Sequence, residues 1–80
     1  MNLRYYSDYV EWMGVPILYS QHALQRMVLR GISRREVEQA IRSGSKSRQD
    51  SRVVASFRYF DVVYEVRRKR IFVSTVKPRW

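Results

Sequence analysis

The 80-residue sequence contains no cysteine and only one histidine. Without cysteine, the chain has no disulfide, no thiolate nucleophile and no thiolate metal ligand. Acidic residues are also few: seven Asp and Glu stand against 16 Lys and Arg, which gives a formal net charge of +9. No apolar run approaches the roughly 18 residues of a membrane-spanning helix. We therefore expect neither a disulfide-stabilised protein nor a membrane protein.

Hydrophobic residues are numerous enough for a folded domain. They make up 45% of the chain, and 14% of the residues are aromatic. We expect a single domain over residues 1–80, in which an aromatic N-terminal segment (1–16) precedes the core of the domain (17–77). The positive charge favours nucleic acid as the partner, ahead of an acidic protein or an anionic membrane surface. A merely soluble, charged surface is the alternative interpretation.

The N-terminal segment begins MNLRYYSDYVEW. It carries acidic residues and tyrosines where a secretory signal peptide has an apolar run, so we expect a cytoplasmic protein. Tyr5, Tyr9 and Trp12 recur at helical spacing, which is compatible with a short helix before Gly14 and Pro16. The ILYS that follows is compatible with a short strand.

Two short helices are indicated in the middle of the chain. Ser20 suits an N-cap, and QHALQRMVLR continues to Gly31, which suits the position after a helix end. The stretch SRRE has the S-x-x-E spacing of a capping box. The sequence therefore predicts helices over residues 21–30 and 34–42. The apolar side of the first helix is expected to consist of Ala23, Leu24, Met27 and Val28.

From residue 45 onward, the hydrophobic period changes from 3.6 to 2. RVVASF, DVVYEV and IFVSTV are typical of strands, and SKSRQ is a weaker fourth candidate. The short links between them predict antiparallel pairing. A two-residue turn in the last hairpin would place Val62 opposite Thr75, at the end of the core-facing side. The sequence thus predicts an α+β fold, with two N-terminal helices packed on a three- to four-stranded antiparallel sheet.

The first predicted helix carries the residues best suited to catalysis. Residues four apart are neighbours on a helix, so His22, Arg26 and Arg30 form one row. RNA cleavage needs a group that transfers a proton and cations that hold the phosphate, and this row supplies both. A surface histidine beside solvated arginines is the competing interpretation. We expect no metal site and no cofactor, because one histidine with scattered carboxylates lacks ligand spacing.

A second basic cluster lies between the last two predicted strands. Four like charges at one turn repel each other, so the turn is either solvated or occupied by phosphate. Both interpretations, plain solvation and RNA contact, remain open at this point. The cluster consists of Arg67, Arg68, Lys69 and Arg70.

HALQRMVLRGIS, REVEQAI and the late VSTV together resemble a bacterial and archaeal domain-of-unknown-function family with the pattern H-A-x-x-R-M-x-x-R-G-I-S. The resemblance covers about residues 18–77, and that family is placed in the superfamily of barnase, EndoU, colicin and RelE ribonucleases. It implies a RelE- or barnase-like fold and metal-independent RNA cleavage. It further implies that His22, Arg26 and Thr75 are catalytic and that Arg30 binds phosphate.

The function expected from these observations is that of a metal-independent endoribonuclease, the toxin of a toxin–antitoxin pair. Its partners would be RNA, including ribosome-associated RNA, and an acidic antitoxin protein. One alternative is a non-catalytic RNA- or ribosome-binding module. The other is a helix-turn-helix DNA-binding protein, although its second helix would then turn Glu36 and Glu38 toward the DNA phosphates, which repel them.

Overall fold

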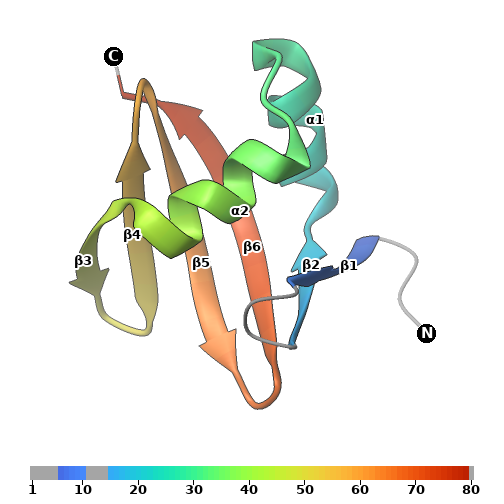
Figure 1. The fold of residues 1–80 in the computed structure, drawn as a ribbon, viewed down its shortest axis with the longest axis vertical. Coiled ribbons are helices and arrows are strands. Elements are labelled where there is room, and N and C mark those ends of the chain that lie inside the picture. The colour runs from blue at the N-terminus through green and yellow to red at the C-terminus, as the bar shows by residue number, and fades with distance from the viewer. Residues whose placement is uncertain (1–5, 11–14, 80) are drawn as a thin grey trace.

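The computed structural model describes residues 6–10 and 15–79. The strands of this part of the chain form one six-stranded sheet in the order β1-β2-β6-β5-β4-β3 (Figure 1). Neighbouring strands are antiparallel, except that β2 runs parallel to β6. The elements along the chain are β1 (Tyr6–Val10), β2 (Val15–Tyr19), α1 (Gln21–Arg30), α2 (Arg34–Ser43), β3 (Ser45–Gln49), β4 (Arg52–Phe57), β5 (Phe60–Arg67) and β6 (Arg70–Pro78).

The fold is α+β, but the predicted architecture of two N-terminal helices on a three- to four-stranded antiparallel sheet is wrong. Two strands precede the helices, and β2 makes the sheet mixed by pairing in parallel with β6. This pairing joins segments about 54 residues apart, as in Ile17 opposite Ile71, and local periodicity carries no signal for it. Residues 17–19 of the stretch ILYS belong to strand β2, which covers Val15–Tyr19, and SKSRQ forms β3.

The aromatic spacing of the N-terminal segment is compatible with a helix, but the structure has a strand there. Residues 6–10 form strand β1, which pairs with β2 at the edge of the sheet. The remaining residues of that predicted helix, 1–5 and 11–13, lie outside the described part of the chain.

Both predicted helices are confirmed, and so are the residues that delimit them. The Ser20 hydroxyl accepts a hydrogen bond from the Ala23 amide at 3.0 Å and caps α1. Gly31 ends α1 with a left-handed φ of 69°, which glycine adopts without steric cost. Ser33 and Glu36 form both hydrogen bonds of the capping box at the start of α2. These local signals fix where each helix begins and ends.

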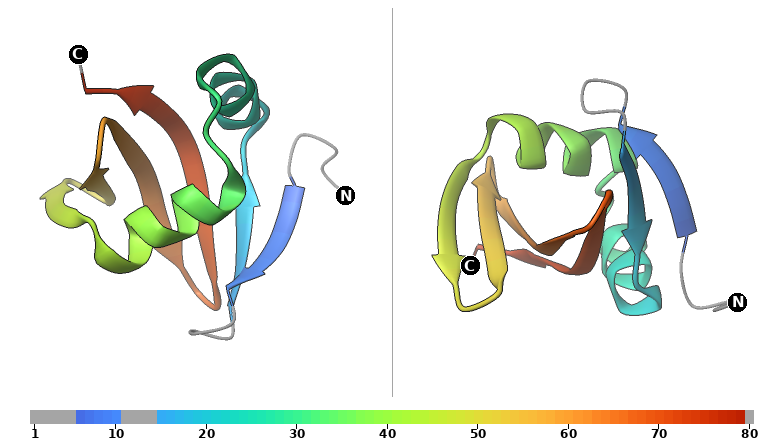
Figure 2. Two further views of the ribbon diagram at one scale, coloured as in Figure 1. Left: turned by 45° about the horizontal axis from the view of Figure 1, so that its top comes forward. Right: turned by 90° about the horizontal axis from the view of Figure 1, so that it is seen from below.

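The hydrophobic core lies between the helices and one face of the sheet. α2 lies across β4 and β5, whereas α1 packs mainly against β6, beyond the end of β2 (Figure 1). In the right-hand view of Figure 2, the sheet curves round α2. Burial of apolar surface here is the main favourable contribution to folding. The largest fully buried side chains are Tyr19, Phe60, Ile17, Ile71, Val37, Val62, Val73 and Val76.

An irregularity in the last hairpin corrects the predicted register. Arg67 faces Arg70 across a two-residue turn, as expected, but the register shifts further along the strands. Tyr64 pairs with Val73 and Val63 pairs with Thr75, so Ser74 is an extra residue in β6. Side chains alternate between the two faces of a strand, so one extra residue moves all later side chains to the opposite face. Thr75 therefore lies opposite Val63 rather than Val62, away from the core-facing side.

Candidate functional site

The start of α1 is fixed to β6 by Ser20. The Ser20 amide donates to the Val73 carbonyl oxygen at 3.0 Å, and its hydroxyl donates to the Ser74 carbonyl oxygen at 2.7 Å. The second of these bonds reaches the extra residue of β6, which directly precedes Thr75. The fold thus brings the first turn of α1, which contains His22, to the part of β6 that contains Thr75.

The predicted row on α1 is open to solvent. His22 and Arg30 are exposed and Arg26 is half-buried, whereas Ala23 and Met27 bury the opposite side of the helix. α1 contains no acidic residue, and Arg26 and Arg30 make no ion pair within the described residues. Both guanidinium groups are therefore available to an anionic ligand, and arginine can donate paired hydrogen bonds to a phosphate.

Thr75 is half-buried in the middle of β6. Within the described part of the chain, no hydrogen bond joins its hydroxyl to His22 or Arg26. The adjacent Ser74 hydroxyl donates to the Val63 carbonyl oxygen at 3.1 Å, so the irregular part of β6 is bonded on both sides, to β5 and to α1. The structure places Thr75 beside the start of α1 through backbone contacts.

The basic turn between β5 and β6 is a separate cluster. Figure 1 shows this turn at the bottom of the molecule and α1 at the top. Five residues separate Arg70 from Thr75 along β6, which corresponds to about 16 Å of strand. Arg68, Lys69 and Arg70 are exposed and make no ion pair within the described residues. The structure does not bring the turn together with the α1 row.

Arg67 differs from the rest of the turn, because Glu65 holds it. Its Nη2 and Nε lie 2.8 and 3.0 Å from Glu65 Oε1, and its guanidinium stacks over the Phe72 ring at 4.9 Å. The hydrogen bond from Arg67, with a further contribution from Arg52 at 3.5 Å, lowers the pKa of the Glu65 carboxyl below its usual range. Of the four cations, Arg67 is thus the least available to RNA.

An apolar surface on α1 was not predicted. The helical period assigned Leu24 and Val28 to the same buried side as Ala23 and Met27. Leu24 is only half-buried, however, and Val28 is 81% exposed. The neighbouring Leu29 is 74% exposed. Hydrophobic periodicity defines the centre of a buried side but not its width, which depends on the shape of the sheet beneath.

No ligand geometry for a metal was found in the part of the chain that the structure describes. No three His, Cys, Asp or Glu residues there lie close enough together to hold a metal ion. Over the same residues, no helix has the length and apolarity needed to cross a membrane.

Comparison with known proteins identifies one family. The family model described as a domain of unknown function (DUF4258) matches residues 19–77, from the last residue of β2 into β6. The matched region contains both helices and every candidate residue discussed above. No curated protein and no solved structure matches the chain.

Proposed function

The chain belongs to the DUF4258 family, and because that family is described as a domain of unknown function, we propose a function from the site itself: metal-independent cleavage of RNA at the α1 row. The observation that supports this proposal most is the open His22–Arg26–Arg30 row on a helix that Ser20 anchors to β6. HALQRMVLRGIS resembles the pattern of a family that is placed in the superfamily of barnase, EndoU, colicin and RelE ribonucleases, and this placement supports the same chemistry.

The proposed reaction follows from what these side chains can do. The RNA 2′-hydroxyl attacks the adjacent phosphorus, the bond from phosphorus to the 5′-oxygen breaks, and a 2′,3′-cyclic phosphate forms. A proton leaves the 2′-hydroxyl and another reaches the 5′-oxygen; His22 transfers one of these protons, and solvent water transfers the other. Arg26 and Arg30 stabilise the negative charge that grows on the phosphate oxygens. Thr75 contributes a hydroxyl that can donate a hydrogen bond near the same end of α1.

The basic turn provides a second contact for the same substrate. Arg68, Lys69 and Arg70 are exposed at the far end of the hairpin, so they contact the backbone of an extended RNA rather than the phosphate that is cleaved. RNA, including ribosome-associated RNA, is accordingly the proposed substrate. An acidic antitoxin protein is the proposed inhibitor, because a chain with a net charge of +9 attracts polyanions in general.

The DNA-binding alternative fits the geometry less well. In a helix-turn-helix protein, the second helix enters the major groove. Here α2 lies across the sheet with Val37, Ala40 and Ile41 buried. Its first turn carries Glu36, whose carboxylate accepts a hydrogen bond from the Ser33 amide at 2.9 Å. An acidic residue at this end of the helix opposes approach to phosphates.

The test is RNA cleavage by purified protein in excess EDTA, with the products analysed for a 2′,3′-cyclic phosphate. We expect His22→Ala to lower the cleavage rate about 10²- to 10⁴-fold. Its melting temperature should hardly change, because His22 is exposed. Gln39→Ala, which truncates a polar side chain on α2, is the matched control and should retain the wild-type rate.

Each other outcome excludes a part of the proposal. Full activity of His22→Ala would make the histidine a surface residue. Loss of cleavage in EDTA would indicate a metal-dependent mechanism. A wild-type protein that binds RNA tightly but never cleaves it would be a non-catalytic RNA- or ribosome-binding module.

A further inference from the structure

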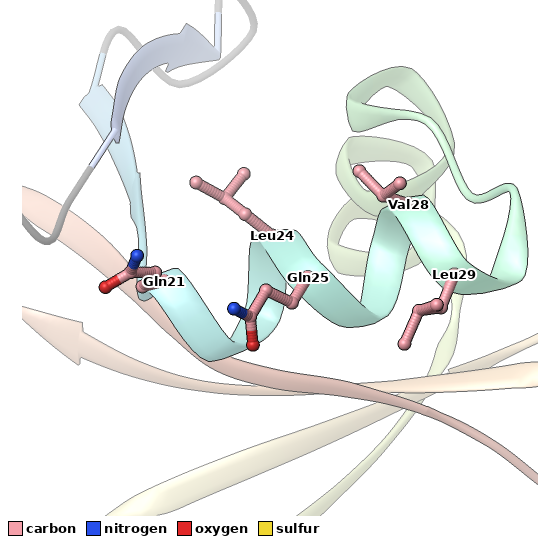
Figure 3. Close-up of a pocket in the computed structure, with 5 residues that line it drawn as sticks. All are labelled: Gln21, Leu24, Gln25, Val28 and Leu29. Carbon is pink, nitrogen blue, oxygen red and sulfur yellow. The ribbon is translucent and has the colours of Figure 1, made fainter.

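The outer side of α1 forms an apolar surface that no element of the described structure covers. Val28 is 81% exposed, Leu29 is 74% exposed and Leu24 is half-buried. Together with Gln21 and Gln25 they line a shallow hollow of about 490 Å³ (Figure 3). Exposed aliphatic side chains gathered in this way, rather than scattered singly, mark interaction sites.

The spacing of these residues suits a second helix. Leu24 and Val28 are four residues apart, as are Gln25 and Leu29, so the side chains form two neighbouring i, i+4 ridges. Figure 3 shows Leu24 and Val28 on one side of the helix, and Gln25 and Leu29 on the other. Such ridges pack into the grooves of another helix. The ten residues of α1 span about 15 Å, enough for about three turns of a partner helix.

The charge around this surface indicates what kind of partner would bind there. Arg26 lies three residues before Leu29 and therefore borders it, and α1 has no acidic residue. A second copy of the chain would bring two net charges of +9 together with no carboxylate on α1 to compensate them. A lipid bilayer would surround the Gln21 and Gln25 amides with hydrocarbon, which leaves their hydrogen-bonding groups without partners.

We propose that the outer side of α1 binds an acidic amphipathic helix of a partner protein. Apolar side chains of the partner pack on Leu24, Val28 and Leu29, and a flanking carboxylate pairs with Arg26. The inference depends on the exposure and charge of α1, and it holds whether or not His22 supports cleavage. Because Arg26 belongs to both surfaces, a bound helix also excludes RNA from the catalytic row.

The experiment uses the full chain and a synthetic helical peptide of about 20 residues. Its leucines follow i, i+3, i+4, i+7 spacing along one face, and glutamates flank them. A control peptide has the same composition, with its leucines distributed around the helix. Binding is measured by fluorescence anisotropy and mapped by NMR on isotope-labelled protein. We expect the amphipathic peptide to bind at least tenfold more tightly than the control, with shifts concentrated in residues 21–30.

Two variants test whether the peptide binds at this surface and not elsewhere on the protein. Val28→Ser/Leu29→Ser should weaken peptide binding about tenfold or more, whereas Val66→Ser, which removes another exposed valine from β5, should leave it unchanged. RNA cleavage by Val28→Ser/Leu29→Ser should match the wild type, because neither residue belongs to the catalytic row. Peptide binding without any RNA cleavage would refute the proposed function and leave this inference standing.

Three results would overturn the inference. Equal affinity for both peptides would mean that charge alone is recognised. A wild-type dimer that Val28→Ser/Leu29→Ser dissociates would make a second copy the occupant. Binding to phosphatidylglycerol vesicles that is tighter than peptide binding, and that the same double variant abolishes, would assign the surface to a membrane.

Discussion

The Ser20 hydroxyl donates a hydrogen bond to the Ser74 carbonyl oxygen at 2.7 Å, across 54 residues of sequence. The same hydroxyl accepts a hydrogen bond from the Ala23 amide at 3.0 Å. One side chain thus caps α1 and fixes it to the irregular part of β6. The proposed site depends on this double role, because His22 lies two residues after Ser20 and Thr75 directly follows Ser74.

Replacement of Ser20 by alanine should affect both stability and activity. Loss of an N-cap costs about 0.5–2 kcal/mol of unfolding free energy, and the Ser74 carbonyl oxygen also loses its hydrogen-bond donor. Ser33→Ala is the matched control, since it removes the cap of α2, which lies outside the proposed site. Denaturant unfolding should show a loss for both variants. At a temperature where both are folded, only Ser20→Ala should cleave RNA more slowly. Equal cleavage rates would mean that the anchor does not position the site.

Gly44 should tolerate no side chain. A Cβ built there would lie 2.6 Å from the Ala40 carbonyl oxygen and 2.8 Å from the Ser56 carbonyl oxygen. Both are backbone atoms, so relief requires α2 and β4 to separate, and we expect Gly44→Ala to lower the unfolding free energy by about 1–3 kcal/mol.

Gly31, which follows the end of α1, provides the control for Gly44. Gly31 has open space around its Cα but a φ of 69°, a conformation that asparagine adopts more readily than most other residues with a side chain. Gly31→Asn should therefore cost less than Gly31→Ala, whereas Gly44→Asn should cost at least as much as Gly44→Ala. Thermal unfolding of the four variants measures both differences. A smaller loss for Gly44→Asn than for Gly44→Ala would show that the contact at Gly44 relaxes easily.

The sequence was sufficient to predict features that depend on neighbouring residues. Ser20, Gly31 and the Ser33–Glu36 capping box delimit the helices through hydrogen bonds that span at most four residues. Alternation in RVVASF, DVVYEV and IFVSTV likewise indicated the strands that became β4, β5 and β6. Such signals are local, and one sequence contains them in full.

Features that depend on distant contacts were missed. The parallel pairing of β2 with β6 joins segments that both helices and three further strands separate in sequence. The extra Ser74 in β6 has no signature in IFVSTV, yet it moves Thr75 to the other face of the sheet. The exposure of Val28 depends on where the sheet ends beneath α1 rather than on the helical period. Strand β1 was missed as an element, because the aromatic spacing of its segment is also compatible with a helix.

RNA binding should be strongly electrostatic, and the β5–β6 turn should contribute to it. Neutralising Arg68 and Lys69 should reduce the slope of log K against log salt by up to about two, because two phosphate contacts are lost. Lys69 has a φ of 62°, so the variant is best made as Arg68→Gln/Lys69→Asn, which keeps a residue that tolerates this conformation. Lys46→Gln/Arg48→Gln removes the same charge from the exposed strand β3 and serves as the control. An equal fall in slope for both variants would mean that the whole surface attracts RNA without preference for the turn.

Arg26 should be sensitive to a substitution that preserves its charge. If its guanidinium donates two hydrogen bonds to the phosphate, the single ammonium of lysine cannot replace both, so Arg26→Lys should cleave RNA at least tenfold more slowly. RNA affinity should change much less, since the charge remains. Arg26→Gln loses both properties and should be slower still. Arg35→Lys, a substitution at an exposed arginine of α2, should retain the wild-type rate. The measurement is single-turnover cleavage at saturating protein, which separates the chemical step from binding. A wild-type rate for Arg26→Lys would show that Arg26 acts only as a point charge, and a wild-type rate for Arg26→Gln would exclude it from the site.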